Sequence, residues 1–145
     1  MPRSILITAA LLIPLLTSCR NYLFTVNERE VYAPPKVFTD YHIADAALGA
    51  CVAQTLTDLN ITRPGQLTRL VCTHANIGDL AGLEVFTNLA QLNLAHNRLT
   101  DIKPLLYLNH LTAVDLSANP DLVCADALLL ELHTDRLQFP SHCQD

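Results

Sequence analysis

The sequence has no tryptophan, one methionine and only four glycines in 145 residues. It contains no phosphate-binding loop, dinucleotide fingerprint, nucleophile elbow or metalloprotease motif. Positive charge is also scarce, because nine Lys and Arg stand against fourteen Asp and Glu, for a formal net charge of −5. No basic stripe is therefore available to neutralise phosphates. These absences argue against an enzyme, a cofactor, a small-molecule substrate and a nucleic-acid partner.

No apolar run reaches the roughly twenty residues that a membrane-spanning helix needs. The longest one, residues 5–16, covers about a dozen residues and follows Arg3, which predicts a signal peptide over residues 1–18. The run ends in Leu16-Thr17-Ser18-Cys19, which resembles the lipobox of bacterial lipoproteins. The resemblance implies cleavage before Cys19, acylation of that cysteine (for example with palmitate) and attachment to a membrane. A plain secretory signal with Cys19 near the cut is the alternative.

The residue after the lipobox also bears on location. Arg20 stands where lipoproteins retained in the inner membrane of Gram-negative bacteria commonly have Asp, so the resemblance implies the outer membrane. Residues 19–39 lack sustained periodicity and contain Pro34-Pro35, which favours extended backbone and predicts a tether. The alternation of apolar residues around Phe24 leaves a short strand packed on the following domain as a second interpretation.

Apolar residues recur with a period of 22 across residues 67–122, in about three units. Each unit begins with a Leu-x-x-Leu-x-Leu pattern, which predicts a short strand, and stacked units predict a parallel sheet on one face. Asn97 and Asn119 follow the strands, where a carboxamide can satisfy backbone groups that a sharp turn leaves unpaired. The inward positions are Leu67, Leu70, Cys72, Ile77, Leu80, Leu83 and Phe86, then Leu89, Leu92, Leu94, Leu99, Ile102, Leu105 and Leu108, then Leu111, Val114 and Leu116.

Residues 89–105, LAQLNLAHNRLTDIKPL, resemble the 22-residue leucine-rich repeat of the bacterial internalin type. The resemblance covers residues 40–145 and implies an α/β fold: a short right-handed solenoid with a parallel strand face, short helical turns behind it, and partner binding by the concave strands. Two departures stand out. Ala75 occupies the turn position of the first unit, and Asn119-Pro120-Asp121-Leu122 is one residue longer than its counterpart, which predicts that regular stacking stops there.

The segments flanking the repeats are predicted to be caps. In residues 40–66, apolar residues recur every three or four positions and predict one amphipathic helix, with Thr39 or Asp40 as its N-cap, that covers the first coil. Residues 123–145 predict a C-terminal cap with a short helix, whose apolar residues are Leu128, Leu129 and Leu132.

Five cysteines are an odd number for an exported chain, and lipidation of Cys19 removes one. The other four fall as one pair on each side of the repeats, which predicts disulfides in an oxidising compartment. Each disulfide closes a loop of about twenty residues and contributes about 3 kcal/mol. Buried free thiols are the alternative, whereas a zinc site lacks Cys-x-x-Cys spacing or paired histidines. The predicted pairs are Cys51 with Cys72 and Cys124 with Cys143.

The outward strand positions are candidates for partner contact. They lack the aromatic anchors of tight interfaces, so we expect a weak or small binding surface, or a sheet that is merely solvated. His74 and His96 share one repeat position, and stacked imidazoles could hold a metal or sense pH. The next coil has Ala118 there, which leaves no third ligand, so we favour no metal. The partner-binding candidates are Arg69, Val71, Thr73, Gln91, Asn93, Asp115 and Ser117.

These patterns together predict a membrane-anchored envelope lipoprotein that presents a small leucine-rich-repeat domain to a protein partner. A passive structural or assembly component of the outer membrane is the alternative. A metal-binding protein or enzyme that uses His74 and His96 is the least favoured hypothesis.

Overall fold

The computed structural model describes residues 24–26, 29–33 and 35–144. The expected signal peptide and Cys19 lie outside these residues. The described chain divides between Pro34 and Pro35 into two units. In the first, β1 (Phe24–Val26) and β2 (Arg29–Tyr32) form an antiparallel pair. The segment expected to be a tether therefore contains a short strand, paired with its own neighbour.

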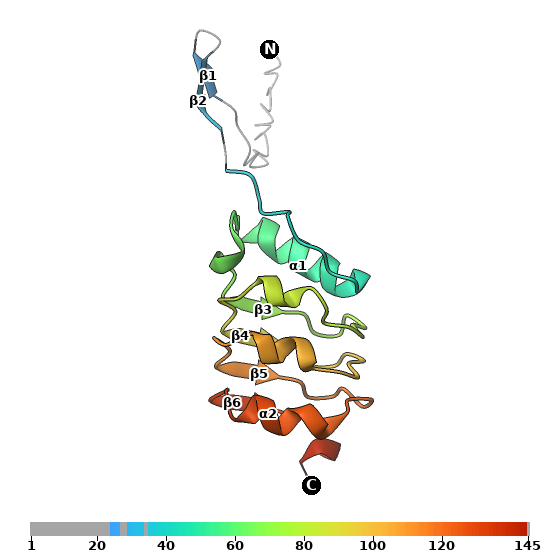
Figure 1. Cartoon of the computed structure of the whole chain (residues 1–145). Helices are drawn as coiled ribbons and strands as arrows, with labels where there is room; N and C mark the ends of the chain where they lie inside the picture. The colour runs from blue at the N-terminus through green and yellow to red at the C-terminus, as the bar shows by residue number, and fades with distance from the viewer. Residues whose placement is uncertain (1–23, 27–28, 34, 145) are drawn as a thin grey trace, which may run out of the picture. The chain divides into compact units, whose positions relative to one another are not determined.

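Four short strands form a parallel sheet in the second unit (Figure 1). They are β3 (Arg69–Val71), β4 (Gln91–Asn93), β5 (Ala113–Asp115) and β6 (Arg136–Gln138), in that order. The first three pair at the 22-residue offset of the repeats, so that Leu70, Leu92 and Val114 lie in register. The parallel sheet that the sequence predicts is thus present.

The fourth strand corrects one prediction. We expected regular stacking to stop after Asn119, but β6 pairs with β5 and places Leu137 beside Val114. The extra residue of the third unit is accommodated in an exposed turn at Pro120 and Asp121. Because the insertion lies in a turn rather than in the core, the chain returns to the sheet in register.

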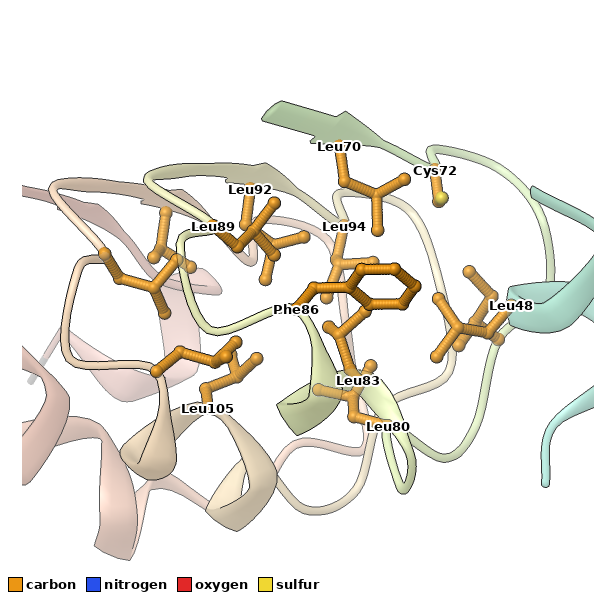
Figure 2. Close-up of a cluster of buried hydrophobic side chains, with 14 of the residues drawn as sticks. Leu48, Leu70, Cys72, Leu80, Leu83, Phe86, Leu89, Leu92, Leu94 and Leu105 are labelled. Atoms are coloured by element: carbon orange, nitrogen blue, oxygen red, sulfur yellow. The ribbon is translucent and has the colours of Figure 1, made fainter. Parts of the chain in front are cut away.

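The core consists of the inward repeat positions predicted from the sequence, all of which are buried. Figure 2 shows Phe86 among leucines that come from the strands and from the opposite side of each coil. Leu48 from the preceding helix enters the same cluster and is fully buried. Short 3₁₀ helices run behind the strands and agree with the α/β solenoid that the repeats predict. They are η2 (Leu83–Val85) and η3 (Lys103–Tyr107). Three further 3₁₀ helices, η1 (Pro64–Gln66), η4 (Cys124–Asp126) and η5 (Ser141–Cys143), lie outside the first two 22-residue units.

The helix before the repeats, α1 (Ala46–Asp58), begins later than the sequence suggests. Its N-cap is Asp45, and the predicted caps Thr39 and Asp40 are exposed. This correction has a structural reason, because residues 35–43 form no helix and instead dock on the domain: the Phe38 amide donates to the Ile61 carbonyl at 2.7 Å.

Aromatic side chains fix this docked segment. Phe38 and Tyr41 stack with ring centroids 5.8 Å apart, and both meet the edge or face of buried Phe86, at 6.3 and 5.6 Å. Val37 and Ile43 also pack against the core. The packed part of the domain therefore starts ahead of the expected boundary at Asp40.

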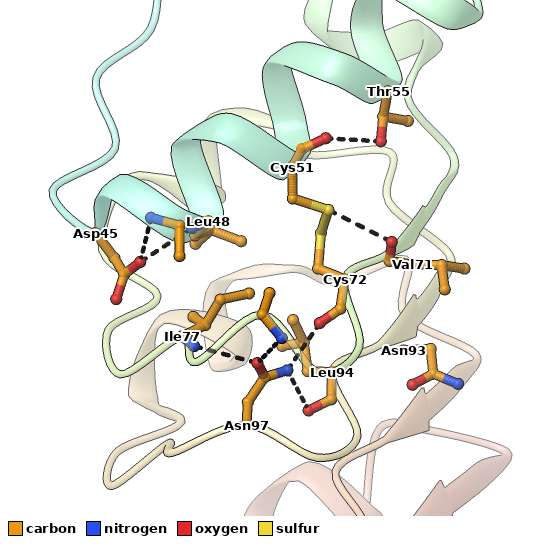
Figure 3. The surroundings of a disulfide bond; sticks show 12 residues. Asp45, Leu48, Cys51, Thr55, Val71, Cys72, Ile77, Asn93, Leu94 and Asn97 are labelled. Atoms are coloured by element: carbon orange, nitrogen blue, oxygen red, sulfur yellow. Dashed lines mark hydrogen bonds between the residues drawn. A yellow bond between two sulfur atoms is a disulfide. The ribbon is translucent and has the colours of Figure 1, made fainter.

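Both predicted disulfides are present. Cys51 of α1 is bonded to Cys72, which follows β3, and their Cα atoms lie 6.0 Å apart (Figure 3). Cys124 is bonded to Cys143 with a Cα separation of 5.4 Å. The first disulfide therefore links α1 to the repeats, whereas the second closes the C-terminal segment on itself.

The C-terminal helix α2 (Ala127–Glu131) differs from its prediction in which residues it buries. Leu130 is buried, whereas Leu129 and Leu132 are 49% and 77% exposed. The helix is only five residues long, and Leu132 ends it as the C-cap, so this leucine points away from the core. Among the described residues, no helix has the length and apolarity to cross a membrane.

Candidate functional site: the exposed strand face

The middle residue of each strand is directed into the core, so the residues on either side of it project from the opposite face of the sheet. Their register forms two rows across the strands. Both rows line an open hollow of about 300 Å³. We call them the first column, Arg69, Gln91, Ala113 and Arg136, and the second column, Val71, Asn93, Asp115 and Gln138.

Arg136 and Gln138 were missed by the sequence interpretation because β6 was not expected. A signal did exist, since Arg136-Leu137-Gln138 repeats the polar-apolar-polar pattern of Gln91-Leu92-Asn93. Its offset from the preceding strand is one residue longer than the repeat, and a search that allowed this single insertion would have found it.

The second column is largely engaged in hydrogen bonds within the protein. The Asn93 side-chain amide donates to Asp115 at 3.2 Å, and Asn93 accepts from the Ala95 amide at 3.0 Å. Asp115 also accepts from the hydroxyl and the backbone amide of Ser117, at 2.6 and 3.0 Å. Three predicted contact residues, Asn93, Asp115 and Ser117, therefore shape the ends of their own strands.

The first column is different, because its polar side chains have no such partners. Arg69, Gln91 and Arg136 are exposed. Within the described ranges, ion pairs involve only Lys103, with Asp101 and Asp126, and none of the described side-chain hydrogen bonds uses these three residues. Thr73, beyond the end of β3, is half-buried. The first column, together with Gln138 of the second, is thus the part of the face whose donors have no partner among the described residues.

Asn97 and Asn119 lie at the turns as predicted, and both are buried, at 3% and 0% exposure. Each one bonds its own turn and the turn of the preceding coil. Asn97 accepts from the amides of Ala75 and Ile77 at 3.0 and 3.1 Å and donates to Cys72 and Leu94 carbonyls at 2.7 and 2.8 Å (Figure 3).

Asn119 repeats this arrangement one coil later, accepting from the Leu99 amide and donating to the Leu94 and Leu116 carbonyls. The pattern explains the departure at Ala75. An asparagine there would reach toward a preceding coil, but α1 occupies that place. Asn97 already accepts a hydrogen bond from the Ala75 amide. The first turn still differs from the next one, because Asn76 also has a positive φ, 60°, and its counterpart Arg98 does not.

His74 and His96 stack on adjacent coils, with ring centroids 4.1 Å apart and ring planes 14° from parallel. Both are exposed and have positive φ, 56° and 59°, as has Ala118 at the equivalent turn, 54°. In parallel stacked rings the nitrogens point side by side rather than at one ion. A shared metal would require both rings to rotate. The expectation that no metal binds here stays a prediction.

Elsewhere in the described part of the chain, one group of side chains has metal-like spacing: Cys124, His142 and Cys143. Both of its sulfur atoms belong to a disulfide, which removes the thiolates that a metal needs. This group is therefore a covalent cross-link rather than a metal centre.

Stacked coils of 22 residues, a parallel strand face and buried turn asparagines define a leucine-rich-repeat-like solenoid. No protein-family model matches the sequence, and no curated protein does. Among solved structures, an internalin from Listeria monocytogenes is similar, with a TM-score of 0.57 and 29% identity over 66% of this chain. The match spans 29% of that internalin. The likeness supports a leucine-rich-repeat-like fold and points to a protein-interaction domain.

Proposed function

We propose that this protein is an envelope lipoprotein whose short solenoid binds another protein through the exposed strand face. The observation that carries the proposal is the first column, where polar side chains with no partner among the described residues line an open hollow of the sheet. The similarity to an internalin supports an interaction role. The protein then acts by binding, without catalysis.

In the same proposal, the two flanking segments serve as caps. Leu48, Val52 and Leu56 of α1 cover the apolar edge of the first coil, and each is fully buried. Leu130 of α2 has the same role at the other end, and both ends carry a disulfide. A solenoid of so few coils requires such closure, because a terminal coil otherwise exposes its core.

The membrane anchor is proposed from the lipobox at residues 16–19. The outer membrane is proposed because Arg20 stands where lipoproteins retained in the inner membrane commonly have Asp. Replacement of Cys19 by Ser removes the acylated thiol. We expect it to abolish incorporation of labelled palmitate and to release the protein from the membrane fraction. Retention of label and of membrane association would contradict the anchor. Protease treatment of intact cells then reports which side the domain faces.

The binding role is tested by filling the hollow of the strand face. Ala113 is the smallest residue of the first column and projects outward, so Ala113→Phe adds bulk without entering the core. We expect it to abolish crosslinked capture of a partner from cells. Ala50→Phe makes the same change at an exposed position of α1 and serves as the control.

Both variants should retain the melting temperature of the wild type. Capture that is unchanged in Ala113→Phe would remove the strand face from the proposal. A single stoichiometric envelope protein among the captured partners would indicate an assembly role, whereas capture from a host surface would indicate adhesion.

A further inference from the structure

The two arginines of the first column occupy opposite edges of the sheet. Arg69 lies on β3 and Arg136 on β6, and the register aligns them through Gln91 and Ala113. Neighbouring strands are about 4.8 Å apart, so the two arginine positions are separated by three spacings, or about 14 Å. The positive groups therefore bracket the face rather than cluster on it.

The residues between the arginines favour an extended ligand. The Gln91 carboxamide has no partner in the described structure. The small side chain of Ala113 leaves a recess in the middle of the column. The nearest acid of the face, Asp115, is half-buried and already accepts hydrogen bonds from Asn93 and Ser117. The face thus presents hydrogen-bond donors at both edges. Its two arginines contrast with the chain as a whole, which has a formal net charge of −5.

We propose that the strand face binds an extended, acidic protein segment that crosses the strands and carries two carboxylates four residues apart. This inference rests on the proposed binding function and specifies its partner. An extended chain rises about 3.3 Å per residue, so four residues span about 13 Å. Residues i and i+4 also project from the same side, because the side-chain period of an extended chain is two.

Each carboxylate then pairs with one guanidinium, whose planar set of N–H donors fits two carboxylate oxygens. Residue i+2 faces the same way and reaches Gln91 and the hollow at Ala113. Because the pairs are exposed, their contribution is modest and decreases as salt increases. Affinity should therefore depend on the spacing of the acids more than on their number.

The test uses the full chain in non-ionic detergent and fluorescent nine-residue peptides with two Asp separated by two, four or six positions. Anisotropy should show about two- to fivefold tighter binding for the four-residue spacing than for the other two, because each of those loses one exposed ion pair. The double variant Arg69→Gln/Arg136→Gln should weaken binding of that peptide about three- to tenfold and reduce its salt dependence, because both exposed ion pairs are lost. Arg98→Gln removes an exposed arginine outside the two columns and should leave binding unchanged.

Equal binding of all spacings, or equal binding by the double variant, would overturn the inference. Tighter binding of a sulfated glycan fragment than of any peptide would overturn it in favour of a carbohydrate. Partner capture that is lost in Ala113→Phe but kept in the double arginine variant would refute the acidic segment while leaving the binding function intact. Capture that survives both changes would refute both.

Discussion

At the scale of single residues, Asp45 joins two parts of the chain that are distant in sequence. One carboxylate oxygen accepts from the amides of Ala47 and Leu48 at the start of α1, at 2.9 and 3.0 Å. The other accepts from Gly78 and Asp79 in the first coil, at 2.9 and 3.3 Å. The helix cap is thereby also a contact between α1 and the repeats.

These contacts make the stability pH-dependent. Burial acts to raise the pKa of Asp45, but the four amide donors together hold it below its usual range. The charged form is thus favoured by folding, so its stabilisation is complete above about pH 4, the ordinary Asp pKa, and is lost as the pH falls through the lowered pKa. Asp45→Asn should lower the free energy of unfolding by about 1–2 kcal/mol at pH 7, because an amide nitrogen cannot accept from Gly78 and Asp79.

The difference between wild type and Asp45→Asn should shrink when denaturation is repeated at progressively lower pH. Asp40→Asn, at an exposed position just before the helix, is the control and should leave the unfolding free energy nearly unchanged. A constant difference from pH 7 to pH 2 would show that Asp45 does not act through its charge.

Gly82 provides a second test at this scale. Its φ is +96°, and a Cβ there would collide with the carbonyl of His42 and approach Ile43. Gly82→Ala should therefore cost about 3 kcal/mol in urea denaturation, by strain and by displacing the docked segment. Gly49→Ala, inside α1, is the matched control, because its Cβ would only touch Ile43 at 3.9 Å. It should stabilise the protein by about 0.5–1 kcal/mol. Equal effects of both changes would refute this explanation.

At the scale of elements, neighbouring coils are joined by the buried asparagines as well as by the strands. Asn97 accepts two backbone N–H groups of the preceding coil, from Ala75 and Ile77, whereas Asn119 accepts one, from Leu99. A buried donor left without a partner costs about 1–3 kcal/mol. The two turns should therefore differ in their sensitivity to substitution.

We expect Asn97→Ala to destabilise the protein by about 3 kcal/mol or more, and Asn119→Ala by less. Asn109→Ala, at an exposed position with no described side-chain bond, should change stability by under about 0.5 kcal/mol. Guanidinium denaturation of the three variants gives the comparison. A larger loss for Asn119→Ala would show that the number of accepted bonds does not determine the cost.

The strands illustrate how far sequence interpretation reaches at this scale. The strands β3 to β5 follow from local spacing, since apolar residues in a fixed period identify the inward side of every coil. The fourth, β6, breaks that period by one residue, so a search with a fixed period misses it, and its pairing with Asp115 and its neighbours establishes it. The N-cap was misplaced for a related reason, because Asp45 caps the helix locally but also binds the first coil, a contact that the local sequence does not show.

At the scale of the whole molecule, the two disulfides stabilise a solenoid that is near the lower limit of length. They close loops with sequence separations of 21 and 19 residues. Loop-closure entropy assigns about 3 kcal/mol to each. Because one disulfide holds α1 to the first coil and the other closes the C-terminal segment, their loss should loosen the ends first.

We therefore expect a reducing agent to lower the melting temperature of the wild type markedly. The variants Cys51→Ala/Cys72→Ala and Cys124→Ala/Cys143→Ala should each show about half of this sensitivity, and the combined variant almost none. Circular dichroism melting curves provide the measurement. Wild-type curves that coincide with and without the reducing agent would contradict a stabilising role.

The apolar period alone determines which residues are buried, the 22-residue register of the first three strands and the outward direction of the candidate binding residues. It does so because burial on a repeating coil depends on local spacing. The tertiary structure alone decides that residues 37–43 dock on the domain and that β6 extends the sheet. It also decides that Asn93 and Asp115 form a hydrogen bond, while Arg69 and Arg136 have no partner among the described residues. These features depend on partners far away in the chain, which the fixed period of the repeats does not identify.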